Sequence, residues 1–132
     1  MLLQAAALAG LALVPALVSG FVQVQREEPL APGEVRAATA RLWGEKVLFV
    51  DARNQRRYED GHIPGALLLN EEQWDTLWPL FADVWEPDRT VVVYCDGGGC
   101  EASHRVAARL QEALQVNTVF VLKGGYPAWQ RK

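Results

Sequence analysis

Cysteine and clustered basic charge are both scarce in this 132-residue chain. Only Cys95 and Cys100 are present, so a network of disulfides across a small fold is excluded. The 13 Lys and Arg residues are outnumbered by 16 Asp and Glu, and they form no basic stripe interleaved with aromatic residues. This pattern speaks against a nucleic-acid partner. A chain of this length holds one hydrophobic core and hardly two.

Charge is absent from the first 25 residues, which contain no Asp, Glu, Lys or Arg. Residues 5–22 are almost wholly apolar and are long enough to cross much of a hydrocarbon layer of about 30 Å. We predict that residues 1–25 are a membrane segment, retained as a single-pass anchor. Two alternatives stay open: a signal peptide cleaved ahead of Phe21, favoured by Pro15 and the small residues near Gly20, and a buried helix of a soluble core.

The sequence also bears on the side of the membrane that the rest of the chain occupies. Arg26 and Arg36 favour the cytoplasm, but Glu27 and Glu28 dilute that signal. The uncharged N-terminus resembles an export signal, so we favour the extracytoplasmic face. Cleavage of the segment would instead give a secreted or periplasmic protein.

Residues 26–33 are polar and contain Pro29 and Pro32, which predicts a linker before a folded domain over residues 34–132. Within that domain, apolar runs alternate with amphipathic stretches. Strands are expected over 47–50, 66–69, 91–94 and 118–122, and helices over 35–43, 73–84 and 102–114. The alternation predicts an α/β fold with a mainly parallel sheet, and the continuous apolar runs predict helices on both of its faces.

Cys95 is the first candidate for chemistry because it ends the apolar run 91–94 and opens a glycine-rich turn that leads into a helical pattern. Backbone N–H groups converge at such a place, and the dipole of the following helix favours negative charge. A helix N-terminus can lower the pKa of a cysteine from about 8.5 to roughly 3.5–7.5, which yields the nucleophilic thiolate. The alternative is a small buried cysteine with a packing role.

Four blocks of sequence then carry a family resemblance. They read VLFVDAR at 47–53, YEDGHIPGA at 58–66, VVVYC at 91–95 and LKGGYPAW at 122–129. Their order and spacing resemble a single rhodanese-like domain. The resemblance implies a rhodanese fold and a sulfurtransferase, with no cofactor. Its cysteine accepts a sulfane sulfur as a persulfide and passes it to a thiol acceptor, either a small molecule or a protein.

Carried over residue by residue, the resemblance makes Cys95 the nucleophile. It assigns the loop that cradles the transferred group to Asp96, Gly97, Gly98, Gly99, Cys100 and Glu101. Three residues of the following turn are auxiliary candidates, namely Ser103, His104 and Arg105. Three others, Asp51, Arg53 and His62, are expected to have structural roles.

The chain departs from the family pattern in its loop. Family members that use thiosulfate commonly carry basic loop residues, whereas here Asp96 and Glu101 are acidic and the first basic side chain is Arg105. We expect these two acids to disfavour a doubly charged donor. Related phosphatases carry an arginine where Glu101 stands, which argues against hydrolysis of phosphate esters.

Cys100 has two open interpretations. It is either a resolving thiol that attacks an oxidised Cys95 or a spectator. A noncatalytic binding or redox-sensing module that uses the Cys95/Cys100 pair is therefore the alternative to a sulfurtransferase. No metal site is expected, because Cys95, Cys100 and His104 lack paired ligand spacing.

Overall fold

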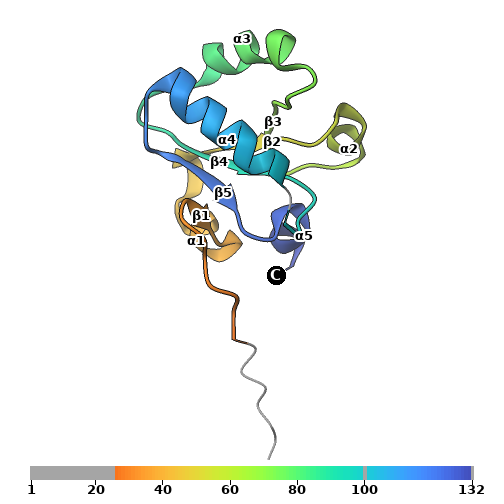
Figure 1. The fold of residues 1–132 in the computed structure, drawn as a ribbon, viewed down its shortest axis with the longest axis vertical. Helices are drawn as coiled ribbons and strands as arrows, with labels where there is room; N and C mark the ends of the chain where they lie inside the picture. The colour runs from red at the N-terminus through yellow and green to blue at the C-terminus, as the bar shows by residue number, and fades with distance from the viewer. Residues whose placement is uncertain (1–25, 100, 132) are drawn as a thin grey trace, which may run out of the picture.

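A five-stranded parallel sheet organises residues 26–99 and 101–131, the part of the chain that the computed structural model describes (Figure 1). The strand order is β1-β5-β4-β2-β3, and every neighbouring pair is parallel. The strands are β1 (Glu34–Val35), β2 (Val47–Asp51), β3 (Leu67–Leu68), β4 (Thr90–Tyr94) and β5 (Val119–Leu122). The helices are α1 (Ala37–Leu42), the 3-10 helix η1 (Gly44–Lys46), α2 (Gln55–Asp60), α3 (Trp74–Val84), α4 (Glu101–Leu114) and α5 (Gly125–Gln130).

The central strand β4 is buried on both of its faces. Val91 and Val93 contribute to a core cluster with residues of α3 and α4, while Val92 and Tyr94 contribute to a second cluster with residues of α1 and α5. Successive side chains of a strand point to opposite faces, so a continuous apolar run requires cover on both. The α/β fold with a mainly parallel sheet flanked by helices is confirmed.

Helix α4 closes one face of the sheet and carries the residue that packs beside Cys95. Its buried residues are Ser103, Val106, Ala107 and Leu110, spaced three, four and seven residues apart as an amphipathic helix requires. Figure 1 shows this helix lying across the sheet, with α3 at one end of the molecule and α1 at the other. The first turn of α4 is thereby fixed against the end of β4.

The N-terminal part of the domain differs from the sequence prediction. The helix expected from residue 35 begins only at Ala37, because Glu34 and Val35 form an edge strand paired with β5. Burial of Val35 in the sheet and a hydrogen bond from Lys123 N to Val35 O hold this strand in place. The short helices α2 and α5 were not predicted, although the Asn54 side chain caps α2 by accepting from Arg57 N.

The predicted membrane segment, residues 1–25, lies outside the described residues. Within the described ranges, 26–99 and 101–131, no helix combines the length and the apolar character needed to cross a bilayer.

Candidate active site

Cys95 follows β4 directly and is almost fully buried, with 4% of its surface exposed. Its Sγ atom lies 3.5 Å from Oγ of Ser103, a residue of the first turn of α4. The structure holds Cys95 in a disulfide. Cys100, the other cysteine of the sequence, lies outside the described residues. The contact with Ser103 places the Cys95 sulfur beside the first turn of α4.

The loop after Cys95 is held by the junction between β5 and α5. Gly97 has φ +97°, and a Cβ on this residue would lie 2.5 Å from the carbonyl oxygen of Gly124. A Cβ on Gly125 would lie 2.4 Å from the carbonyl oxygen of Cys95, which also accepts a hydrogen bond of 2.7 Å from Tyr126 N. Only glycine permits this close approach of two backbones. The pair Gly124-Gly125 is therefore a part of the site that sequence reasoning had not assigned.

A small cleft of about 50 Å³ opens beside the cysteine. Its lining comes from four parts of the chain: Glu34, Cys95, Gly97, Gly98, Gly99, Ser103, His104, Val121, Leu122, Lys123, Gly124 and Gly125. A water molecule occupies about 30 Å³ in the liquid, so the cleft has room for a group of one or a few atoms. This size suits a group of a few atoms rather than a drug-sized ligand.

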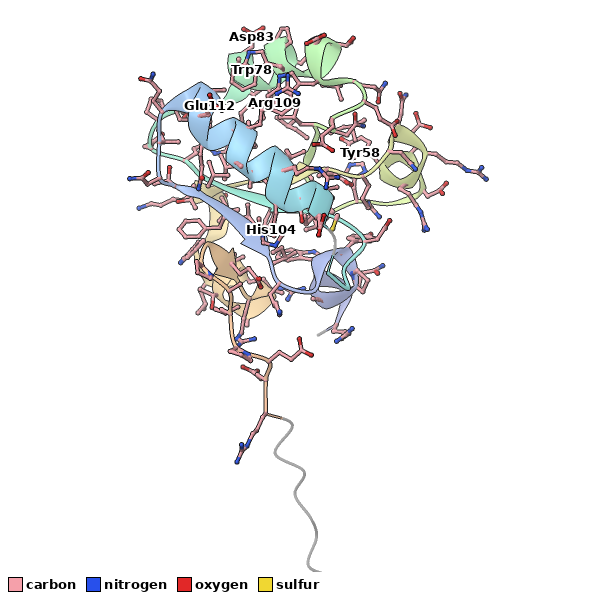
Figure 2. All side chains as sticks on the ribbon, viewed as in Figure 1. Tyr58, Trp78, Asp83, His104, Arg109 and Glu112 are labelled. Carbon is pink, nitrogen blue, oxygen red and sulfur yellow. The ribbon has the colours of Figure 1, made fainter. Side chains whose placement is uncertain are left out.

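Three charged or titratable side chains meet at this cleft. The Glu34 side chain, only 9% exposed, lies with Oε2 3.6 Å from Lys123 Nζ and with Oε1 4.0 Å from His104 Nε2. Figure 2 shows His104 on α4 near the middle of the molecule, far from the labelled Trp78 and Asp83 of α3. His104 was an auxiliary candidate. Glu34 and Lys123 were missed, although Lys123 directly follows the carboxyl end of β5, where ligands of such sheets bind. Glu34 opens the unpredicted strand β1 and reaches this edge by pairing with β5.

The loop acids Asp96 and Glu101 do not line the cleft. An oxygen of Asp96 lies 3.4 Å from Arg53 Nη1, and its other oxygen lies 3.9 Å from Arg57 Nε. Glu101 pairs with Arg105 at 3.5 Å. Both carboxylates therefore carry counter-charges outside the cleft. The expected repulsion of anionic donors would require both carboxylates to lie in front of the cysteine, and they do not lie there.

Arg105 itself faces away from the cleft. Its Nε donates to both oxygens of Glu71, at 3.0 and 3.1 Å. Of the three auxiliary candidates, the structure therefore brings Ser103 and His104 to the cysteine and leaves Arg105 on the surface.

Arg53 and Asp51 form a buried ion pair beneath the loop. Arg53 donates through Nε and Nη2 to the Asp51 carboxylate at 2.7–3.1 Å, and Tyr94 donates its hydroxyl to Asp51 at 3.0 Å. The pKa of Tyr94 is raised above its ordinary value, first by burial and then by the negative charge of Asp51. Burial alone would lower the pKa of Arg53, but hydrogen bonding to Asp51 and its charge raise it overall.

His62 lies outside the cleft and supports the turn before β3. Its Nδ1 is 2.7 Å from the carbonyl oxygen of Tyr58, and its ring stacks on the Tyr58 ring with centroids 3.8 Å apart. The Tyr58 hydroxyl in turn donates to the carbonyl oxygen of Ala66. This geometry supports the structural role expected of His62.

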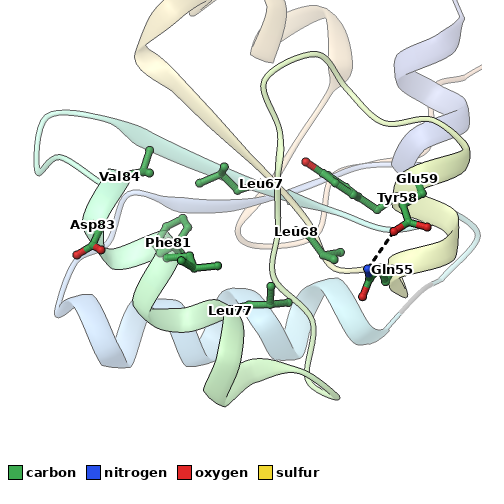
Figure 3. A pocket seen from close by; sticks show the side chains of 10 residues that line it. Gln55, Tyr58, Glu59, Leu67, Leu68, Leu77, Phe81, Asp83 and Val84 are labelled. Carbon is green, nitrogen blue, oxygen red and sulfur yellow. Dashed lines mark hydrogen bonds between the residues drawn. The ribbon is translucent and has the colours of Figure 1, made fainter.

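A second, larger cavity of about 510 Å³ lies between α2, β3 and α3 (Figure 3). Its floor is apolar and includes Leu68, Leu77 and Phe81, while Gln55 donates to Glu59 at its rim. No cysteine lines it. Cys95 therefore lines the small cleft and not this cavity.

Fold and site together define a class: parallel α/β domains with a cysteine at the carboxyl end of the central strand, cradled by a glycine-rich loop. Comparison with known families is consistent with that class. The chain belongs to the rhodanese-like domain family, whose sequence model matches residues 34–132.

Similar proteins occur in bacteria. A thiosulfate sulfurtransferase of Pseudomonas aeruginosa is 33% identical over 104 residues, which cover 67% of this chain and 38% of that protein. A tRNA uridine(34) hydroxylase of Yersinia enterocolitica is 33% identical over 88 residues, which cover 64% of this chain and 24% of that protein. The chain thus spans less than two fifths of these relatives.

A solution structure of a rhodanese-like domain from Anabaena shows the same fold. It superposes with a TM-score of 0.56 at 29% identity, and the match covers 76% of this chain and 74% of that one.

Proposed function

We propose that the protein is a sulfurtransferase in which the reduced form of Cys95 carries a sulfane sulfur as a persulfide. The position of the Cys95 sulfur carries this proposal. It is buried at the end of β4, 3.5 Å from the Ser103 hydroxyl, and it lines a cleft bounded by Gly97, Gly98 and Gly99. Left-handed glycines turn backbone N–H groups toward such a cleft, and a hydroxyl donor favours the anion further.

Two displacements move the sulfur. The Cys95 thiolate attacks the outer sulfur of the donor, a sulfur–sulfur bond forms, and the donor's own sulfur–sulfur bond breaks as its leaving group departs with the electron pair. An acceptor thiolate then attacks the outer sulfur of the persulfide and regenerates the Cys95 thiolate. The cycle starts from reduced Cys95, so the disulfide seen in the structure must first be opened by a thiol reductant.

Thiosulfate and organic persulfides are the donor classes that we propose, and a small-molecule or protein thiol is the acceptor. The name of the Pseudomonas relative supports the general chemistry. The cleft of about 50 Å³ supports transfer of a single atom.

The second candidate is a noncatalytic module that uses the Cys95/Cys100 pair as a redox switch. The disulfide at Cys95 favours it, since exchange between a disulfide and two thiols can report a change in redox conditions. In this case a thiol reductant would open the disulfide, a disulfide oxidant would close it again by exchange, and Cys95 would accept no sulfur atom.

Mass spectrometry of the reduced full-length protein separates the two candidates. After incubation with thiosulfate or a persulfide, we expect Cys95 to gain one sulfur atom. The Cys95→Ser variant should gain none, whereas Cys100→Ser should still be loaded, because only Cys95 sits at the strand end before the loop. Equal loss in both variants would show that the cysteines act as a unit. No sulfur on the wild-type protein with any donor would favour the redox module.

A further inference from the structure

The Glu34 carboxylate is the acidic group that lines the cysteine cleft. Its side chain is only 9% exposed, and its Oε2 is buried without a hydrogen-bond partner. A carboxylate removed from water is costly unless a counter-charge or a ligand meets it. A residue kept in this state beside a reactive cysteine calls for a functional explanation.

The nearest counter-charge to Glu34 is Lys123. The Lys123 ammonium lies 3.6 Å from Glu34 Oε2 and also 3.6 Å from the carboxylate of Glu28. The two acids differ in setting: the Glu28 side chain is 84% exposed, whereas that of Glu34 is buried in the cleft wall. Solvent screens the first pair far more than the second. Glu34 is thus the acid that sets the effective charge of Lys123.

This pairing determines the net charge that an incoming anion encounters at the cleft. Lys123 is a lysine that lines the cleft, and an unpaired ammonium there would attract a dianionic donor. With Glu34 beside it, the pair presents no net charge. The loop acids Asp96 and Glu101, by contrast, are paired with arginines away from the cleft.

We propose that Glu34 is a specificity-determining residue, which cancels the charge of Lys123 and so selects weakly charged sulfur donors over dianionic ones such as thiosulfate. This inference rests on the proposed function, because it concerns the donor that loads Cys95. The Coulomb energy of a charge with a dianion is twice that with a monoanion. Removal of the Glu34 charge should therefore help thiosulfate most.

Glu34→Gln is a clean test of this selection. The amide has nearly the shape of the carboxylate, and Oε2 makes no hydrogen bond that the change would break. We expect the second-order rate of Cys95 loading by thiosulfate to rise about fivefold or more at low ionic strength. Loading by cysteamine persulfide, which carries no net charge, should change less than about twofold, and the thiosulfate gain should shrink at high salt.

Two further variants isolate the pair. Glu28→Gln removes the exposed partner of Lys123 and should leave the ratio of the two donor rates within about twofold of wild type. Lys123→Met in the Glu34→Gln background should abolish the thiosulfate gain, as a double-mutant cycle requires of a coupled pair. Should Glu34→Gln fail to fold, Lys123→Met alone exposes the Glu34 charge and should slow thiosulfate more than cysteamine persulfide.

The outcomes are distinct. An unchanged donor ratio in Glu34→Gln, or an equal rise with both donors, would overturn the assignment of Glu34 while the proposed function stands. A gain that persists after loss of Lys123 would overturn it as well. A wild-type protein that takes sulfur from neither donor would sink the proposed function and this inference with it.

Discussion

Arg53 is the single residue that connects most of the site's surroundings. Its guanidinium donates to Asp51 and to the carbonyl oxygen of Gly61, contacts Asp96 in the cysteine loop, and lies 4.5 Å from the centre of the Tyr126 ring. Strand β2, the turn after α2, the loop and α5 thereby meet at one buried charge. Because the whole guanidinium is used, no shorter or neutral side chain can replace it.

We predict that Arg53→Met destabilises the fold by about 3–5 kcal/mol, since it leaves the fully buried Asp51 charge uncompensated. Urea unfolding of the reduced protein measures the change. Arg57→Met is the matched control: its side chain is 61% exposed and its nearest acid lies at 3.9 Å, so a change of less than about 0.5 kcal/mol is expected. Similar losses of unfolding free energy in both variants would show that the buried Arg53–Asp51 pair contributes no more to stability than the exposed Arg57 does.

At the scale of elements, the junction between β5 and α5 supports the cysteine loop through backbone contact. Gly125 and Gly44 have nearly the same φ, +61° and +60°, but a Cβ on Gly44 meets nothing within 4 Å whereas one on Gly125 would strike Cys95 and Gly97. An alanine at either position would thus suffer the same backbone strain, and the two positions differ only in whether there is room for its methyl group.

Gly125→Ala should therefore lower the rate of Cys95 loading at least tenfold, because the loop must move away from the junction to admit the methyl group. Gly44→Ala should cost about 1 kcal/mol of stability and leave the loading rate within twofold. Loading rates and urea midpoints of the two variants separate the effects. If both alanines slowed loading equally, strain alone would explain the loss and the close packing would be irrelevant.

Sequence patterns predicted those elements that are long enough to show a period. The run ending at Tyr94 and the amphipathic stretch of α4 predicted β4, α4 and the location of Cys95 between them. Helices α2 and α5 have six residues each, fewer than two helical periods, and β1 has two residues, a single strand period, so no repeating pattern could reveal them.

Sequence patterns could not predict the part of the site that is built from residues far apart in the chain. Glu34 and Lys123 come from β1 and the end of β5, and they meet His104 and the cysteine cleft only through the strand order. Likewise, the pairing of Asp96 with Arg53 spans 43 residues. The sequence prediction put the Asp96 charge in front of the cysteine, because the neighbouring sequence does not reveal a counter-charge that lies in another element.

For the molecule as a whole, the buried Tyr94 hydroxyl links stability to alkaline pH. Its pKa, and that of Tyr58, is raised above the ordinary 10.0, first by burial and then by the charge of Asp51. The folded state keeps these protons at a pH where the unfolded chain loses them. Their stabilising contribution is complete below about pH 10 and declines as pH rises above it.

We therefore expect the free energy of unfolding to fall between about pH 9.5 and pH 11, and to fall less steeply in Tyr94→Phe. The variant should start from a lower value, because it loses the hydrogen bonds to Asp51 and from Ile63 N. Urea titrations at a series of pH values give both numbers. Parallel declines in the two proteins would show that ionisation of Tyr94 does not contribute to the loss of stability at alkaline pH.

Attachment to a membrane is a proposal for the whole chain, since the apolar residues 1–25 lie outside the described structure. We expect the full-length protein to sediment with membranes and to resist extraction by high salt or alkaline carbonate. Deletion of residues 1–25 should release a folded domain, because the cores are built from residues at and beyond Val35. A mature N-terminus at Phe21 would replace the anchor by a cleaved signal and make the protein secreted or periplasmic.

For an anchored chain, the side of the membrane on which the domain lies would decide which sulfur compounds reach Cys95. We propose the extracytoplasmic face, because the short, apolar N-terminus resembles an export signal more than a translocated tail, and because Glu27 and Glu28 dilute the opposing signal of the nearby arginines. Protease added to sealed, right-side-out vesicles should then cut the exposed linker at residues 27–33 without lysis. Cutting only after the vesicles are opened would place the domain in the cytoplasm. There the prevailing reduction would keep the Cys95 disulfide open, so the thiol form would dominate.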